Sequence, residues 1–403
     1  MPMRTLRGAL RTAATIVAAC LATSIPPISA SATASVQASA PRQGARAATP
    51  QLGAATAREL DQVIRSTAAS AGVPGVIVGL WMPGQPRYVR AFGIADKSDC
   101  APMRPDLYMR IASETKTFTV TALLRLVDEG VVRLDDPVSD YLPGVPDGRR
   151  ITLRDLADMR SGLFPYTDDT GFEHDLLSDP HREFTPQELL RIAFLHPNRP
   201  FAPGTAFEYS NTNTIVLGLL VEKETHLPLR DAIRDLVTGP SRLDHTLFPV
   251  AAEFPRPHAH GYTEQTLNGE QADATTWNPS WGWAAGAMIS NLEDLHSWAV
   301  NVATGRLLTP ETQAERLDAL PTGAPGDAYG LGIDINNGWI GHTGSQPGYQ
   351  SLTFYLPSLR ATLVVLLNTD ISSQGEKPII LLGRAITRII SPDNIFRPAN
   401  DQS

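Results

Sequence analysis

The stretch Ser113-Glu114-Thr115-Lys116 carries the most information about this chain of 403 residues. A serine and a lysine three positions apart lie on the same side of a helix, one turn from each other. This spacing gives a weak hydroxyl nucleophile a neighbouring proton acceptor. The segment that follows, residues 118–127, has Val, Leu and Thr on most helical faces, which is typical of a buried helix. Burial lowers the pKa of a lysine, so we expect Lys116 to serve as a base near neutral pH.

Two further motifs support a catalytic interpretation of this pair. Ser-x-x-Lys alone is a weak signal, because a helix-capping serine and a solvated lysine produce it by chance. Tyr209-Ser210-Asn211 and His342-Thr343-Gly344 follow it, in that order and at wide separations. The three motifs together favour a catalytic set over a coincidence.

This set resembles the motifs of the penicillin-recognising serine hydrolases, which include Ser-x-x-Lys and Lys-Thr-Gly. Tyr-x-Asn and His-Thr-Gly are similar to the variants in the class C β-lactamase-like branch. Within that branch the chain most resembles the secreted D-alanyl-D-alanine carboxypeptidases of actinobacteria. The resemblance covers residues 71–390 and includes Leu126-Val-Asp-Glu-Gly130, Ser161-Gly-Leu163, Tyr209-Ser-Asn-Thr-Asn213, Ala285-Gly-Ala287 and Tyr329-Gly-Leu-Gly332.

The resemblance implies a role for each catalytic residue. Ser113 is expected to be the nucleophile that forms an acyl-enzyme. Lys116 and Tyr209 are expected to share its proton, and the sequence leaves open which of them is the acylation base. Asn211 is expected to orient the lysine and donate to the substrate amide. The backbone N–H groups of Ser113 and Ser345 are expected to hold the oxyanion.

Other residues are expected to bind substrate or to support the site. The third motif, with Thr343 and Gly344, is predicted on an edge strand to which an extended peptide can add. His342 can be a structural donor on that strand. Trp281 and Thr167 match pocket-lining positions of the secreted carboxypeptidases.

Neither a metal nor a cofactor is expected. His258-Ala259-His260 has the spacing of metal ligands on a strand, but the sequence suggests no third ligand, so we interpret the pair as structural.

The pattern predicts a mixed α/β fold of the β-lactamase/transpeptidase type. Its five-stranded antiparallel sheet is predicted from β-branched or aromatic runs and flanked by the terminal helices. The predicted strands are residues 76–82, 87–94, 339–343, 350–356 and 361–368. The predicted hydrolase domain covers residues 54–391, with its sheet part at 54–115 and 278–391, a largely helical insertion at 116–277, and a C-terminal tail at 392–403.

The first residues are typical of a secretory signal peptide. Three arginines precede an apolar stretch at residues 12–28, and small residues follow it, so residues 1–32 are predicted to be removed after Ala30 or Ala32. A second interpretation is lipidation of Cys20, which would anchor the protein to the membrane. Residues 33–53 are predicted to be a disordered tail rich in Ala, Ser and Pro. The predicted location is secreted or in the cell envelope.

Composition agrees with a secreted globular enzyme. A hydrophobic content of 42% can build a sizeable core, and a net charge of −8 gives no reason to expect nucleic acid as a partner. The two cysteines provide no disulfide framework once residues 1–32 are removed. No later segment is apolar enough to span a membrane, and we expect a monomer with a small peptide, ester or β-lactam substrate.

The leading functional prediction is a D-alanyl-D-alanine carboxypeptidase acting on peptidoglycan peptides. An esterase, a β-lactamase and an inactive penicillin-binding protein remain alternatives. One departure concerns the substrate: Asp334 stands where the related carboxypeptidases have an arginine for the terminal carboxylate. The absence of Gly-x-Ser-x-Gly and His-Glu-x-x-His motifs argues against α/β-hydrolases and zinc proteases.

Overall fold

A nine-stranded antiparallel sheet is the centre of the fold in the computed structural model, which describes residues 51–196 and 200–398. The strand order is β3-β2-β1-β13-β12-β11-β10-β9-β8. The prediction of five strands was wrong in number, because the five predicted strands form only the middle of this sheet. The predicted signal peptide with Cys20, the tail up to residue 50, and residues 399–403 lie outside the described residues.

The strands that were missed are short and carry few of the residues that favour strands. The two hairpin strands next to β11 have four residues each and contain Gly, Asp or Asn, and the outermost strand on either side has two residues and ends in proline. The strands are β1 (Gly75–Trp81), β2 (Tyr88–Asp96), β3 (Ala101–Pro102), β8 (Leu320–Pro321), β9 (Asp327–Gly330), β10 (Ile333–Asn336), β11 (Trp339–Gln346), β12 (Tyr349–Leu356) and β13 (Ala361–Leu367).

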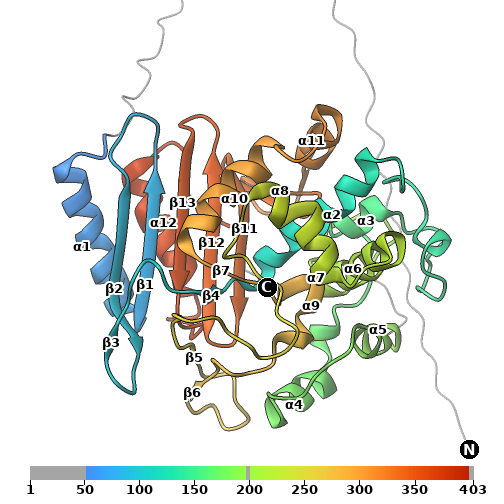
Figure 1. Cartoon of the computed structure of the whole chain (residues 1–403), viewed down its shortest axis with the longest axis horizontal. Helices are drawn as coiled ribbons and strands as arrows, with labels where there is room; N and C mark the ends of the chain where they lie inside the picture. Colours follow the sequence, from blue (N-terminus) through green and yellow to red (C-terminus); the bar gives the residue numbers. More distant parts are fainter. Residues whose placement is uncertain (1–50, 197–199, 399–403) are drawn as a thin grey trace, which may run out of the picture. The chain divides into compact units, whose positions relative to one another are not determined.

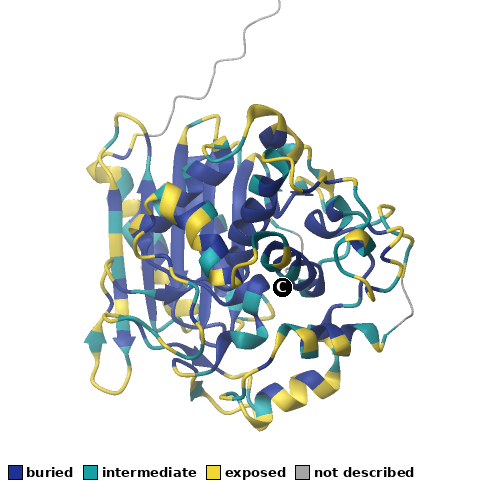
Figure 2. Cartoon of the chain, turned by 45° about the vertical axis from the view of Figure 1, so that its right-hand side comes forward, coloured by how far each residue is buried: buried dark blue, intermediate teal, exposed yellow. Residues whose placement is uncertain are grey.

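The middle strands are buried on both faces, as Figure 2 shows in dark blue. Because successive side chains alternate between faces, Leu363 and Val365 join one hydrophobic core while Val364 and Leu366 join the other. The first of these cores lies under two helices that pack on each other, α1 (Ala54–Ser70) and α12 (Pro378–Ile390) (Figure 1). The terminal helices therefore cover one face of the sheet.

The other face carries the helices that position the site. α2 (Thr115–Asp128) and α10 (Leu292–Thr304) pack there, with the remaining helices beyond them (Figure 1). These are α3 (Leu153–Ala157), α4 (Thr170–Ser178), α5 (Pro186–Phe194), α6 (Asn211–Thr225), α7 (Leu229–Ile233), α8 (Gly239–Ser241), α9 (Trp283–Gly286) and α11 (Pro310–Leu317). Two small ladders pair β4 (Met109–Arg110) with β7 (Ile289–Ser290) and β5 (Tyr262–Thr263) with β6 (Ala272–Asp273). Among the described residues no helix is both long and apolar enough to cross a membrane.

Candidate active site

The turn that carries Ser113 packs closely against the sheet. Ser113 lies in the 3-10 turn Ala112–Glu114, directly before α2, and Ala112 has a φ of 47°. A Cβ atom on Gly344 of β11 would come within 2.1 Å of the Ile111 carbonyl oxygen. Glycine at 344 thus lets the third motif approach the backbone next to Ser113.

Lys116 is completely buried one helical turn after Ser113. Its Nζ lies 3.0 Å from Ser113 Oγ and donates to the Ala285 carbonyl at 2.9 Å. The same nitrogen is 4.8 Å from the centre of the Tyr209 ring. Burial lowers the pKa of Lys116 well below its ordinary value of 10.5. An uncharged amine in this position can take a proton from the serine hydroxyl.

The second motif stands at the start of α6. Asn211 is the first residue of this helix, and its Nδ2 donates to Thr167 Oγ1 at 3.4 Å. The Tyr209 ring stands edge-on to Tyr329 at 6.2 Å between ring centres. The beginning of α6 therefore brings the second motif beside Lys116.

The third motif is hydrogen-bonded to Tyr329 of β9. Tyr329 Oη lies 3.0 Å from Nε2 of His342, and Nδ1 of His342 is hydrogen-bonded to the Thr343 carbonyl oxygen. Both rings are buried, and burial raises the pKa of Tyr329 well above its usual value. Sequence analysis noted Tyr329 only as part of a Tyr-Gly-x-Gly motif, without a role.

The third motif was predicted on an edge strand, and the structure corrects this prediction. β11 lies inside the sheet, since residues 340 and 341 pair with β10 as well as β12. Residues 342–346 continue past the end of β10 and pair with β12 alone. Only this half of β11, which includes Thr343, has an open edge.

A cleft of about 920 Å³ opens onto Ser113. Of the other residues predicted for the site, it is lined by Thr167, Tyr209, Asn211, Trp281 and Ser345. The remaining predicted residues, which are Lys116, His342, Thr343 and Gly344, are buried and lie outside the cleft lining. The structure thus brings ten predicted residues into one region, six on the wall and four behind it.

The cleft wall is strongly acidic. The charged residues among its lining are Asp168, Glu173, Glu208, Glu264, Asp370 and Lys377. Partial burial raises the pKa of Asp168, and burial together with the charge of Asp168 raises the pKa of Glu208. These two carboxyl groups therefore lie close together, beside Tyr209. None of these five acids could be recognised from the sequence, because single charged residues in separate segments form no motif.

Asp334, the position that differs from the carboxypeptidases, is not among the residues that line the cleft. It lies on β10 opposite Gly341, and its charge contributes to the raised pKa of Tyr329. The cleft lining therefore gives no evidence that the Asp334 carboxylate meets a substrate.

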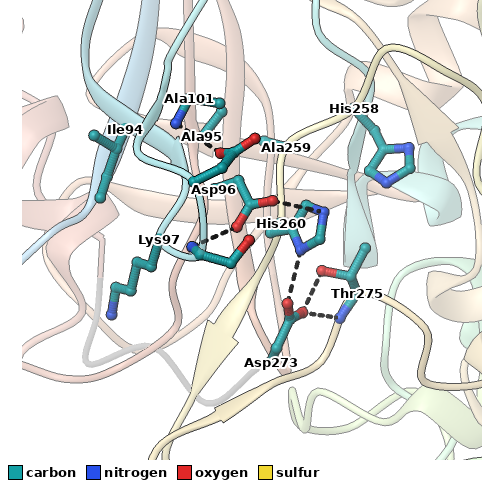
Figure 3. A network of polar contacts seen from close by, with 12 residues as sticks. Ile94, Ala95, Asp96, Lys97, Ala101, His258, Ala259, His260, Asp273 and Thr275 are labelled. Carbon is teal, nitrogen blue, oxygen red and sulfur yellow. Dashed lines mark hydrogen bonds and ion pairs between the residues drawn. The ribbon is translucent and has the colours of Figure 1, made fainter.

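His258 and His260 take part in contacts that join separate segments. Figure 3 shows His260 between two carboxylates, with Nδ1 2.7 Å from Asp273 and Nε2 3.4 Å from Asp96. His258 stacks on Phe254, with 4.6 Å between ring centres. Within the described residues, no group of three or more His, Cys, Asp or Glu side chains is placed to hold a metal ion.

An antiparallel sheet with a Ser-x-x-Lys helix at its side defines the class of penicillin-recognising serine hydrolases. The chain belongs to the beta-lactamase family, whose family model matches residues 60–384. A D-stereospecific amidohydrolase from a Streptomyces species is 30% identical in sequence, with a TM-score of 0.74 over 83% of this chain and 98% of that one. A D-amino acid amidase from Ochrobactrum anthropi SV3 is 29% identical, with a TM-score of 0.70 over 78% of this chain and 92% of the other.

Curated relatives in this family carry several functional names. A D-aminopeptidase from Cereibacter sphaeroides is 27% identical over 320 residues, which are 76% of this chain and 59% of that protein. The chain thus spans less than two thirds of the length of these relatives. Others are named a putative penicillin-binding protein, an esterase and a beta-lactamase.

Proposed function

We propose that this serine hydrolase forms an acyl-enzyme on Ser113 and cleaves small amides and peptides of D-amino acids that carry a free amino group. The observation that carries the proposal is the acidic cleft next to the Ser113–Lys116 pair. Carboxylates on the wall attract an ammonium group and repel a carboxylate. Among the described lining residues, five are acidic and Lys377 is the only lysine or arginine.

The proposed reaction begins at Ser113. Its Oγ attacks the substrate carbonyl carbon while its proton passes to Lys116 Nζ, 3.0 Å away. The backbone N–H groups of Ser113 and Ser345 stabilise the oxyanion, an arrangement worth about 10² to 10³ in rate per donor. Lys116 then gives its proton to the leaving amine as the C–N bond breaks. A water molecule attacks the resulting ester and releases the acid.

Lys116 is the base that the geometry favours for acylation. It is completely buried, its pKa is lowered, and it lies within hydrogen-bond distance of Ser113 Oγ. The Tyr209 ring covers the amine from a distance of 4.8 Å, which keeps it out of water. A ring face at this distance also attracts a protonated amine, so Tyr209 can accommodate Lys116 after it has taken up the serine proton, and Asn211 lines the cleft wall, where it can meet the substrate.

The names of similar proteins support the choice of substrate. The two solved structures are titled as a D-stereospecific amidohydrolase and a D-amino acid amidase, and several curated relatives are named D-aminopeptidases. All three names specify the D configuration.

A D-alanyl-D-alanine carboxypeptidase is the second candidate. Lys377 lines the same cleft and offers a positive charge for a terminal carboxylate. The position of Asp334 outside the lining also removes one reason against this function. Either activity fits export to the cell envelope, which we propose from the arginines and apolar stretch at the start of the chain.

Parallel assays of the purified protein distinguish these functions. The substrates are D-alanine amide, its N-acetyl derivative, L-alanine amide, a D-Ala-D-Ala peptide, a p-nitrophenyl ester and a chromogenic cephalosporin. We expect the highest kcat/KM for D-alanine amide among the amides, with the N-acetyl derivative much slower. Ser113→Ala is the control and should lose activity by several orders of magnitude, since loss of a nucleophile elsewhere costs about 10⁶. A preference for a D-Ala-D-Ala peptide whose amino terminus is acylated would replace the proposal by the second candidate.

A further inference from the structure

Glu114 is a buried acid that the proposed mechanism does not use. It directly follows Ser113, is 1% exposed, and does not line the cleft. Neither of its carboxyl oxygens has a hydrogen-bond partner of good geometry. A buried polar group of this kind calls for an explanation, because leaving it unsatisfied costs stability.

The surroundings of Glu114 offer two hydroxyl groups, both from β12. Ser351 and Thr353 are two residues apart and therefore point to the same face of the sheet. Both hydroxyls lower the pKa of Glu114, whereas burial away from water raises it to about 8, and burial prevails. The group is therefore mostly uncharged at neutral pH.

The proton of Ser351 is already engaged in supporting the nucleophile turn. Ser351 Oγ donates to the Ile111 carbonyl at 2.9 Å, and the Glu114 backbone N–H donates to the same oxygen at 3.2 Å. A hydroxyl has only one proton to donate. An uncharged Glu114 needs no donor from Ser351, whereas an ionised carboxylate is a stronger acceptor than a carbonyl and competes for that proton.

We propose that Glu114 is a positioning residue for the nucleophile: its uncharged carboxyl leaves Ser351 bound to the Ile111 carbonyl, and its ionised form withdraws Ser351 and loosens the Ser113 turn. The proposal rests on the function proposed above only in taking Ser113 as the nucleophile. It makes acylation decline as the pH rises through the pKa of Glu114.

The titratable groups on the neighbouring elements must be separated from Glu114. The turn packs against α2, α9, β11 and β12. Their titratable and charged residues are Lys116, Arg125, Asp128, His342, Tyr349 and Tyr355. None of their charges shifts the pKa of Glu114. Loss of a proton from Lys116 raises acylation with pH, which is the opposite direction.

The test measures acylation by a fluorophosphonate and turnover of an uncharged p-nitrophenyl ester between pH 6 and 10. For the wild type we expect a fall of at least fivefold between pH 7 and pH 10, with a midpoint near the Glu114 pKa of about 8. Glu114→Gln should keep most of the neutral-pH rate and lose the alkaline fall. Glu129→Gln, at the end of α2, is the matched control and should follow the wild type.

An alkaline fall of wild-type size in Glu114→Gln overturns the proposal. If that variant does not fold, ¹³C NMR of carboxyl-labelled wild-type protein gives the answer, because a Glu carboxyl carbon must titrate near pH 8. Ionisation of every Glu below pH 6 also overturns it. Failure of the Ser113 mechanism is a separate result, since the wild type would then show no adduct on Ser113 at any pH, and failure of the proposed substrate choice appears only in the amide assays.

Discussion

Lys116 is fixed by two short contacts and by complete burial. It was chosen from sequence by its spacing to Ser113, and the structure adds a 3.0 Å contact and full burial. Its partner Ala285 could not be recognised beforehand, because a backbone carbonyl has no sequence signature. The acids of the cleft escaped prediction for a related reason: Asp168 and Glu208 become neighbours only through the fold.

Replacing Lys116 tests the proton path. Lys116→Ala should lower acylation by more than about 10²-fold, because the serine loses its base. In the wild type the amine should lose its proton well below pH 10.5, since burial lowers this pKa, so the rate should rise with pH before the alkaline fall assigned to Glu114 begins. The variant should lack that rise.

Tyr209→Phe keeps the ring over Lys116, so its acylation rate should fall less than that of Lys116→Ala. The measurement for both variants is the rate of Ser113 adduct formation against pH. A greater loss in Tyr209→Phe would make Tyr209 the base.

Glu208 offers a test of substrate charge. Glu208→Gln should raise KM for D-alanine amide by about two- to fivefold, since a half-exposed charge pair contributes roughly 0.5–1 kcal/mol. KM for a neutral ester should stay the same, because it has no ammonium group. Glu293→Gln, in the first turn of α10, serves as the control. Equal KM changes for both substrates would show that Glu208 shapes the cleft without recognising charge.

At the level of elements, strands were easier to predict than the sheet they build. Runs such as residues 361–367 consist almost entirely of Val and Leu, so their type follows from composition. β9 and β10 were missed because each has only four residues, and they join the sheet through pairing with β11. The length of β10 mattered for the site, because β10 begins only at Ile333 and therefore leaves residues 342–346 of β11 open on one side.

Gly344→Ala tests the contact between β11 and the nucleophile turn. The new Cβ would meet the Ile111 carbonyl at 2.1 Å, and overpacking of this kind costs about 1–3 kcal/mol. We expect a lower free energy of unfolding in urea and a slower reaction of Ser113 with fluorophosphonate. Gly53→Ala is the matched control, since its Cβ would have no atom within 4 Å. Equal stability and reactivity of the two variants would show that the turn can yield without loss.

For the whole molecule, the family and the mixed α/β architecture could be predicted from three motifs. The nine-stranded extent of the sheet and the acidic cleft could not, because both depend on contacts between distant segments. Lys97 and Gln271, for example, are 174 residues apart in sequence and share a hydrogen bond.

The dependence of kcat/KM on ionic strength tests the electrostatic field of the whole cleft. With a net charge of −8 and an acidic cleft wall, the protein should attract a cationic substrate from solution. We expect kcat/KM for D-alanine amide to fall severalfold between about 0.01 and 1 M salt, because the screening length shrinks from about 30 to 3 Å. Turnover of a neutral ester in the same buffers is the comparison, and an equal fall for both would indicate a general effect of salt.

The pairing of β1 with β13 also limits how early the sheet can form while the chain is being synthesised. Val78 and Val365 are register partners although 365 − 78 = 287 residues separate them. At about 5–20 residues per second, a ribosome needs roughly 15–60 s to deliver the second partner after the first. For most of that time β1 can pair with β2 but not yet with β13. The strand with the third motif, β11, is also synthesised late in this interval. A nascent chain therefore cannot become a hydrolase until β11 and β13 have been synthesised.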